Sequence, residues 1–455
     1  MYIKTLALQN FRNYEDRSVD FDAGVNILTG KNGEGKTNML EAVHILSMGR
    51  SFRTQNDAEA IQFGKEFYRI KGLFEKTRED LTVEVRMQGQ GKFYFIDGIK
   101  VQKGADLLDH ALTVIFSPDD LRIVKDGPEK RRRFMDHELF QLKPLYYLDV
   151  IKYRRIVRNR NLLLKEPVLN EHLLDIYDGY FAETGARIMA ERAGFAARLA
   201  KISAGIQGRI TAGSAKEAAG KSTNESAAEE SRLEVSYEPS IEIPGSACTD
   251  SLGAVCADST DAGRADSTDA ARIDSLGVGR TNAPDAEEEI PGSPDAEAMN
   301  PSHARATNLP AGKPAFDRTR QLQEAIADEL KARRAKDREA GSTMKGPHKD
   351  DLKLASGGID LRKYGSQGQQ RTAALALKLA EVDIIKEETG EMPILLLDDV
   401  LSELDEDRQR DLLGSFEDCQ IIITTAELSE SLSQTFPAAR RIEIKSNNTP
   451  IYITE

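Results

Sequence analysis

The sequence predicts an α/β fold, a mixed sheet flanked by helices, with an inserted and largely helical second lobe. Three stretches indicate this fold. A glycine-rich loop at residues 30–37 follows a β-favouring stretch and precedes a helical one. Far along the chain, the apolar stretch at residues 393–397 ends in two aspartates. Between them, residues from about 128 to 209 read as a long helical region with many basic side chains.

Length and composition are those of a cytoplasmic globular protein. The 455 residues leave room for two or three domains, with 40% hydrophobic and 30% charged residues. No apolar run approaches membrane-spanning length, and the first residues do not form a leader. The three cysteines lack metal-binding spacing, which argues against a zinc site or a disulfide framework.

The net charge of −13 does not exclude a nucleic-acid partner, because it is unevenly distributed. Residues 239–316 contain 13 acidic and 5 basic residues, and strongly basic stretches lie elsewhere. The same segment has no aromatic residue between Tyr237 and Phe316 and contains short duplications. Such a composition cannot bury enough apolar surface to offset its chain entropy, so we predict a disordered insert.

The chain begins with a predicted strand at residues 2–8 and a turn at residues 10–14. Arg12 and Asn13 in that turn either reach a nucleotide base or are solvated loop residues. Alternating stretches between residues 68 and 101 predict antiparallel strands, and residues 111–116 a buried strand.

The glycine-rich loop fits the pattern G-x-x-x-x-G-K-[ST] in the context of strand, loop and helix. Its backbone N–H groups and the helix N-terminus would face phosphate oxygens. Lys36 supplies a charge for the β- and γ-phosphates, and the Thr37 hydroxyl can ligate Mg²⁺. The predicted nucleotide-binding residues are Gly30, Lys31, Asn32, Gly33, Glu34, Gly35, Lys36, Thr37 and Asn38.

The apolar stretch that ends in Asp398 and Asp399 predicts the second half of this site. In a phosphate-loop enzyme such a strand is expected beside the strand of the loop. Asp398 would then belong to the Mg²⁺ shell, and Asp399 could orient or deprotonate the attacking water. The alternative is a buried strand that merely ends in two aspartates.

A further anion site is predicted at Ser366, Gln367, Gly368 and Gln369, which open a helix through residues 372–387. Ser366 is placed as the N-cap. One triphosphate does not need two such sites in one chain, so this one is expected to complete the nucleotide site of a neighbouring molecule. A plain capped helix is the alternative.

Basic residues are crowded in the middle of the chain. Lys152 and four arginines surround Tyr153 in one short helical segment, which is either a solvated face or a surface that contacts nucleic-acid phosphates. The candidate DNA contacts are Arg131, Arg132, Arg154, Arg155, Arg158 and Arg160.

Taken together, these motifs resemble the P-loop ABC-type ATPase heads of the SMC-like class, and within that class the RecF family. The matching stretches are residues 10–14, 30–42, 127–128, 131–132, 136, 160–161, 346–348, 350–351, 366–369 and 397–405. The resemblance divides the chain into an ATPase lobe (1–125 and 346–455), a helical lobe (126–238 and 317–345) and the insert (239–316).

The same resemblance implies an ATP-dependent DNA-binding protein of recombinational repair. Two ATP molecules would lie between Lys36 of one subunit and Ser366 of the other in an ATP-induced homodimer. The dimer would bind single-strand gaps and junctions and, with RecR and RecO, promote RecA loading. Weak, DNA-stimulated ATP hydrolysis involving Lys36 and Asp399 would release the DNA. A threonine in residues 420–425 replaces the switch histidine of transporters, which suggests slow hydrolysis.

Three other functions share parts of this pattern. An SMC-type chromosome-structuring head would need long heptad coiled coils, which the middle segment lacks. A transporter subunit would have a much shorter distance between Lys36 and Ser366. A small-molecule kinase would have no use for the Ser366 motif.

Overall fold

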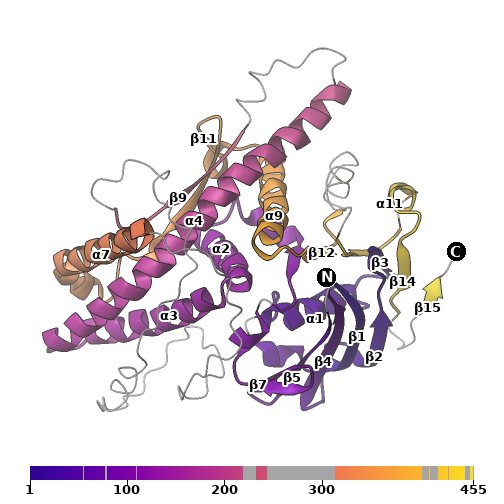
Figure 1. Ribbon diagram of the computed structural model, residues 1–455, viewed down its shortest axis with the longest axis horizontal. Coiled ribbons are helices and arrows are strands. Elements are labelled where there is room, and N and C mark those ends of the chain that lie inside the picture. Colours follow the sequence, from indigo (N-terminus) through magenta and orange to yellow (C-terminus); the bar gives the residue numbers. More distant parts are fainter. Residues whose placement is uncertain are drawn as a thin grey trace.

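The computed structural model describes residues 1–54, 56–76, 79–108, 110–218, 232–242, 313–401, 409, 419–428, 430–445 and 451–453. Figure 1 shows the long helices on one side and the two larger sheets on the other, with both ends of the chain among the sheets. No helix among these residues has the length and apolar character needed to cross a bilayer. The predicted insert falls largely on residues 243–312, outside the described residues, so its disorder stays a prediction.

The central sheet is built from both ends of the chain and has the order β15-β14-β3-β13-β12-β8. Its strands are β3 (Val25–Thr29), β8 (Thr113–Phe116), β12 (Ile394–Asp398), β13 (Ile421–Thr425), β14 (Arg440–Glu443) and β15 (Ile451–Ile453). All neighbours are parallel except β14 and β15. Every residue of β12 is buried, as expected for a strand covered on both faces.

The second sheet is antiparallel, with the order β2-β1-β4-β5-β6-β7. Its strands are β1 (Tyr2–Phe11), β2 (Tyr14–Asp20), β4 (Phe67–Glu75), β5 (Asp80–Gln88), β6 (Gly91–Ile96) and β7 (Ile99–Val101). Helix α1 (Lys36–Met48) shares one core with residues of both sheets, which is why nearly all of it is buried.

Five long helices and a small sheet make up most of the remainder. The helices are α2 (Pro128–Leu142), α3 (Pro144–Leu164), α4 (Glu171–Ala218), α7 (Lys313–Ala340) and α9 (Gln367–Thr389). The small sheet has the order β11-β10-β9, formed by β9 (Leu233–Glu238), β10 (Asp351–Ser356) and β11 (Ile359–Asp360). The short segments are η1 (Asp57–Ala60), η2 (Gly104–Leu107), η3 (Pro118–Arg122), η5 (Pro347–Lys349), α8 (Leu361–Tyr364) and α11 (Glu430–Thr435).

This architecture confirms the predicted fold class, a mixed sheet with flanking helices and a largely helical second lobe. The elements differ in detail. Strand β1 extends through Phe11, so the predicted turn shrinks to two residues. The helical region is three helices and continues to Ala218. Helix α9 begins at Gln367, directly after the predicted N-cap.

The predicted position of the aspartate-bearing strand is wrong. Strand β12 does not lie beside β3. Strand β13 lies between them and pairs with both. Ile421, Ile422 and Ile423 are fully buried, which suits a strand that has a neighbour on each edge. The aspartates still reach the loop, because β3, β13 and β12 run parallel and end at the same edge of the sheet.

Candidate nucleotide-binding site

The loop between β3 and α1 contains three glycines with positive φ, and at two of them a side chain would also meet neighbouring atoms. Gly30 and Gly35 have φ values of +148° and +110°. A Cβ atom on Gly30 would lie 2.4 Å from the carbonyl oxygen of Ile444, and one on Gly35 would lie 2.6 Å from the Asn13 side chain. Both contacts are too short, so a side chain at either position would displace the loop.

The side chain of Lys36 is held inside the loop. Its Nζ donates hydrogen bonds to the carbonyl oxygens of Gly30 (2.6 Å) and Lys31 (3.1 Å). Lys36 is also the first residue of α1, and its N-cap Gly35 supplies no side-chain hydrogen bond. The N–H groups of this helix end therefore have no side-chain cap, and together with the ammonium group they favour an anion.

The turn between β1 and β2 supports the loop from outside. Asn13 Nδ2 donates to the carbonyl oxygen of Glu34 (2.8 Å), and the Tyr14 hydroxyl donates to that of Gly35 (2.9 Å). The amide of Asn38 donates to Asn13 Oδ1 (2.8 Å). Asn13 thus binds the loop itself, a role that sequence analysis did not foresee.

Arg12 is likewise engaged with α1. Its guanidinium group donates to both carboxylate oxygens of Glu41 at 2.9 and 2.6 Å, and Glu41 is fully buried. A third hydrogen bond, of 3.0 Å, goes to the carbonyl oxygen of Glu59. Arg12 has a φ of +53°, a conformation that costs energy outside glycine. We infer that these contacts maintain the position of the turn beside the loop.

The two distant halves of the predicted site meet at one hydrogen bond. Thr37 Oγ1 donates to Asp398 Oδ1 at 2.7 Å, although the residues are 361 positions apart. Asp398 is buried at the end of β12, whereas Asp399 is exposed. A hydroxyl and a carboxylate are hard oxygen ligands that fit Mg²⁺.

Thr424 is one of the two threonines in the stretch expected to replace the switch histidine, and its contact with Asp398 was not foreseen. Its hydroxyl donates to Asp398 Oδ1 (2.9 Å) and accepts the backbone N–H of Asp399 (3.0 Å). Asp399 has a φ of +53°, and such backbone strain persists only where neighbours hold it in place. The available signal was the pair of threonines at the end of β13, the same sheet edge as Asp398.

The helix N-terminus at Ser366 is exposed and carries one side-chain cap. The N–H of Gln369 donates to Ser366 Oγ (3.2 Å), and the N–H of Ser366 donates to Gln369 Oε1 (2.9 Å), which forms a capping box. Among the described residues, no hydrogen bond or ion pair joins Ser366–Gln369 to the glycine-rich loop. The part of the predicted motif at residues 402–405 lies outside the described residues.

The structure contradicts two of the predicted DNA contacts. Arg131 has a side chain only 4% exposed and binds both carboxylate oxygens of Asp351 at 2.7 and 2.8 Å. Arg160 is fully buried and forms ion pairs with Asp178 and Asp337. Contact with a phosphate would require Arg131 to leave Asp351 and Arg160 to leave the buried carboxylate of Asp337.

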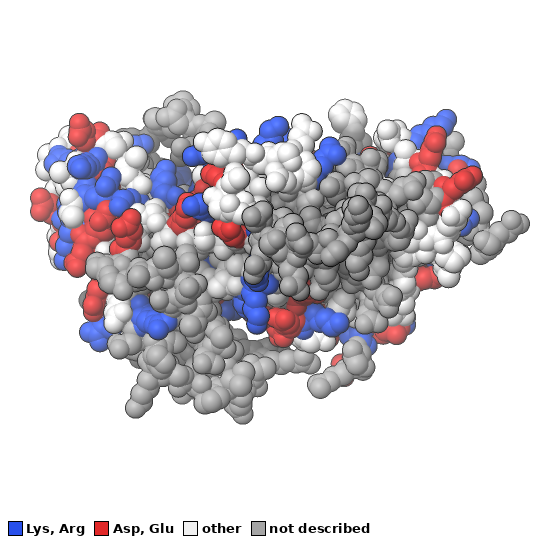
Figure 2. Space-filling model, turned by 90° about the horizontal axis from the view of Figure 1, so that it is seen from above, with Lys and Arg blue, Asp and Glu red and all other residues white. Residues whose placement is uncertain are grey.

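The other four arginines are differently placed. Arg132 is half-buried and donates to the carbonyl oxygen of Asp350 at 2.7 Å. Arg154, Arg155 and Arg158 lie exposed on α3. Figure 2 shows basic and acidic side chains interspersed on the part of this face that the described residues form. DNA contact by these four residues stays a prediction.

Comparisons with known proteins agree on one family. The family model described as the RecF/RecN/SMC N terminal domain matches residues 2–446. The protein named DNA replication and repair protein RecF from Clostridioides difficile (strain 630) is 34% identical over 429 residues, covering 94% of this chain and 92% of the relative. The protein of the same name from Symbiobacterium thermophilum is 34% identical over 444 residues, with 97% and 96% covered.

Two solved structures show the same similarity in three dimensions. Both are described as the recombination mediator protein RecF in the RecFOR pathway, one with ATPrS and one with ATP. They superpose on this chain with TM-scores of 0.74 and 0.73 at 29% identity. In each case all of this chain and 98% of the other are covered.

Proposed function

We propose a function for this chain from the premise that it belongs to the RecF family of DNA replication and repair proteins. The chain binds ATP and, in the ATP-bound state, acts on DNA during replication and recombinational repair. The observation that carries the proposal is the 2.7 Å hydrogen bond between Thr37 and Asp398, which brings the two distant motifs together beside Lys36.

The nucleotide site assigns a task to each of these groups. The loop Gly30–Asn38 surrounds the phosphates, and Lys36 turns from the loop carbonyls to the β- and γ-phosphate oxygens. Thr37 and Asp398 would hold Mg²⁺, which neutralises charge on these oxygens when it is bound. Asp399, exposed beside Asp398, orients or deprotonates the attacking water. Slow, DNA-stimulated ATP hydrolysis follows from this arrangement as a prediction.

The second anion site acts on a partner molecule. Ser366 Oγ accepts a hydrogen bond from the helix N–H of Gln369, so its own O–H remains able to donate to a phosphate of the partner's ATP. Ser366, Gln367 and Gln369 are exposed, and Gly368 allows close approach. ATP would thus bridge two copies of the chain, and the dimer would exist only while the γ-phosphate is present.

The ATP-bound dimer is the form of the protein that binds DNA. We propose that it binds single-strand gaps and junctions, with Arg132, Arg154, Arg155 and Arg158 as candidate phosphate contacts, and that it acts with RecR and RecO to promote RecA loading. The solved relatives are described as recombination mediator proteins in the RecFOR pathway. Hydrolysis would end the ATP-bound state and release the DNA.

The domain division stated above, with an ATPase lobe formed by both chain ends, belongs to this proposal.

Two substitutions test the shared ATP site by sedimentation with a non-hydrolysable ATP analogue, with and without gapped DNA. Lys36→Met should lose nucleotide binding and dimerisation together. Ser366→Arg should retain nucleotide binding but remain monomeric, whereas Ser18→Arg, at an exposed serine on β2, should dimerise normally. A wild-type chain that stays monomeric at saturating nucleotide, or a Ser366→Arg variant that dimerises, contradicts the proposal.

A further inference from the structure

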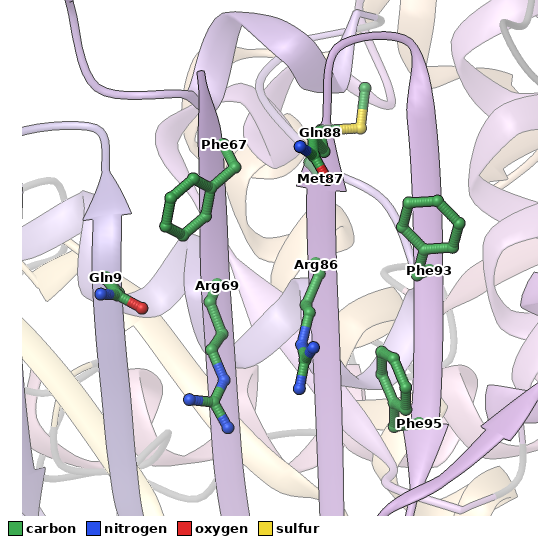
Figure 3. Close-up of a pocket in the computed structure, with 8 residues that line it drawn as sticks. All are labelled: Gln9, Phe67, Arg69, Arg86, Met87, Gln88, Phe93 and Phe95. Atoms are coloured by element: carbon green, nitrogen blue, oxygen red, sulfur yellow. The ribbon is translucent and has the colours of Figure 1, made fainter. Parts of the chain in front are cut away.

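The antiparallel sheet has an unusual outer face. Its inner face packs on α1, so its outer face lies toward solvent and would ordinarily carry polar side chains. Instead, Phe93 and Phe95 of β6 and Phe67 of β4 share this face with Arg69 and Arg86. Figure 3 shows these rings and guanidinium groups around one hollow of about 520 Å³, which Gln88 also lines.

The strand register sets these side chains in rows. Arg69 lies directly opposite Arg86, and Arg86 lies opposite Phe93. Phe93 and Phe95 are two residues apart on one strand, so their Cα atoms are about 7 Å apart on the same face. Aromatic and basic groups therefore alternate over three neighbouring strands.

Around the hollow the charge is positive although the chain as a whole is acidic. Arginines directly opposite each other repel, and both of these bind the carboxylate of Glu84, Arg69 at 2.7 Å. The arginine side chains remain 40% and 47% exposed, and the glutamate side chain only 8%. Lys100 adds a further positive charge, with Nζ 4.5 Å from the centre of the Phe93 ring. Three cations thus face one largely covered carboxylate.

The rings and the cations form planar surfaces on which a base can stack. The guanidinium carbon of Arg86 lies 4.5 Å from the centre of the Phe95 ring. Unstacked nucleic-acid bases stack on aromatic rings and on guanidinium planes, while arginines bind the intervening phosphates. Sheet faces with two or three exposed aromatic residues are a known platform for single strands.

A peptide partner fits this face less well. Strands β4, β5 and β6 each have a paired neighbour on both sides, so a peptide cannot add to them as another strand. What the hollow offers is rings, cations and side-chain amides rather than backbone groups. Bases and phosphates match that combination.

We propose that the outer face of β4, β5 and β6 binds single-stranded nucleic acid, with bases on Phe67, Phe93 and the Arg86–Phe95 pair and phosphates at Arg69 and Arg86. This inference rests on the proposed function, because a gapped DNA contains the single strand that this face would hold.

The test measures binding of a fluorescent oligothymidylate and of a blunt duplex to the full chain with a non-hydrolysable ATP analogue. Phe93→Leu keeps an apolar side chain but removes the flat ring, and should weaken single-strand binding at least fivefold, whereas Phe93→Tyr should bind as wild type. Phe63→Ala is the matched control, because Phe63 is fully exposed and lies outside the hollow. Arg86→Gln should lower the salt slope of single-strand binding by about 0.7.

Dimerisation, duplex binding and the thermal midpoint should be unchanged in Phe93→Leu. Equal binding of the oligothymidylate by Phe93→Leu and wild type, or equal loss of single-strand and duplex binding, overturns the inference. So does an acidic peptide that binds this face when the oligothymidylate does not. A different result would contradict the proposed function. That result is a chain that stays monomeric with the ATP analogue, regardless of the effect of Phe93→Leu on single-strand binding.

Discussion

Replacing Arg160 by leucine tests whether this arginine holds the helical lobe together rather than contacting DNA. From α3, its Nε donates to Asp178 of α4 (2.7 Å), and its Nη1 donates to Asp337 of α7 (2.9 Å) and to Thr343 (2.8 Å). The side chains of Arg160, Asp178 and Asp337 are 0%, 4% and 1% exposed. Leucine would fill much of the space but leave the carboxylates without this partner.

The expected loss in the free energy of unfolding depends on which partners Asp178 and Asp337 keep when Arg160 is removed. Asp178 keeps an ion pair with Arg334 at 2.8 Å. Among the described residues, Asp337 keeps the backbone N–H of Met344 at 3.2 Å and no cation. Removing one partner of a buried ion pair costs about 3–5 kcal/mol, and the pair that Asp178 retains places Arg160→Leu near the lower limit. A loss of about 3 kcal/mol lowers a thermal midpoint by roughly 6–12 °C.

Calorimetry compares the thermal midpoints of the Arg160→Leu and Arg158→Leu variants with that of the wild-type chain. Arg158 is exposed on the same helix, so its replacement should change stability by less than about 0.5 kcal/mol. Adding Asp337→Leu to Arg160→Leu should restore part of the loss, because no uncompensated carboxylate then remains at that position. An Arg160→Leu chain with an unchanged midpoint and weakened DNA binding would refute this reasoning.

Three further predictions concern the nucleotide site and acid stability. Thr37→Val removes the hydroxyl that binds Asp398, so the Mg²⁺ concentration for half-maximal ATP binding should rise about tenfold in a fluorescence titration; an unchanged midpoint contradicts this. Thr424→Val should slow phosphate release while Thr424→Ser preserves it, since only the hydroxyl is needed to position Asp398; equal rates in the two variants would exclude that role. Burial lowers the pKa of His348 to about 4, compared with about 6.5 when unfolded, so unfolding takes up a proton between these values. The contribution of His348 to the free energy of unfolding, fully present above pH 6.5, should therefore decline by up to about 3 kcal/mol toward pH 4. Burial also lowers the pKa of His44 and of His137, so in denaturant titrations His348→Gln should remove only its own part of the acid dependence, and an unchanged dependence contradicts this.

The nucleotide loop was predictable because its function is encoded in adjacent residues. Glycine spacing, Lys36 and Thr37 define a local geometry, and Asp398 ends an apolar strand whose type is evident from composition. Neighbour order in the sheet was not predictable in this way. Buried strands such as β12 and β13 have almost the same apolar pattern, so the pattern does not say which of them lies beside β3.

The error at Arg160 had a detectable signal in the sequence. Tyr153, Ile156, Arg160 and Leu164 recur at helical spacing, and all four are buried. An arginine on an apolar helix stripe must be paired, so the periodicity indicated burial although the local crowding of charge suggested a surface. Its partners, Asp178 and Asp337, were out of reach, because they depend on how three helices pack.

The outer face of the antiparallel sheet shows a further limit of prediction from the sequence. Alternation in residues 92–96 predicts the strand, but it does not say which of its two faces is covered. In the structure, α1 packs on the opposite face of the sheet, and Phe93 and Phe95 therefore lie on the outer face.

The central sheet has a consequence for how the chain is made. Strand β3 pairs with β13 and β14, and β8 pairs with β12. The early strands of this sheet therefore pair with strands that begin about 280 residues later (β8 with β12, 394 minus 113) or almost 400 residues later (β3 with β13, 421 minus 25). The antiparallel sheet of residues 2–101 needs no such partners. A polypeptide that stops before residue 394 therefore has the strands of the antiparallel sheet and of the small sheet, but not the central sheet that positions the nucleotide loop. Unfinished copies would then lack the ATP site on which the proposed dimer depends, and so would not pair with complete copies.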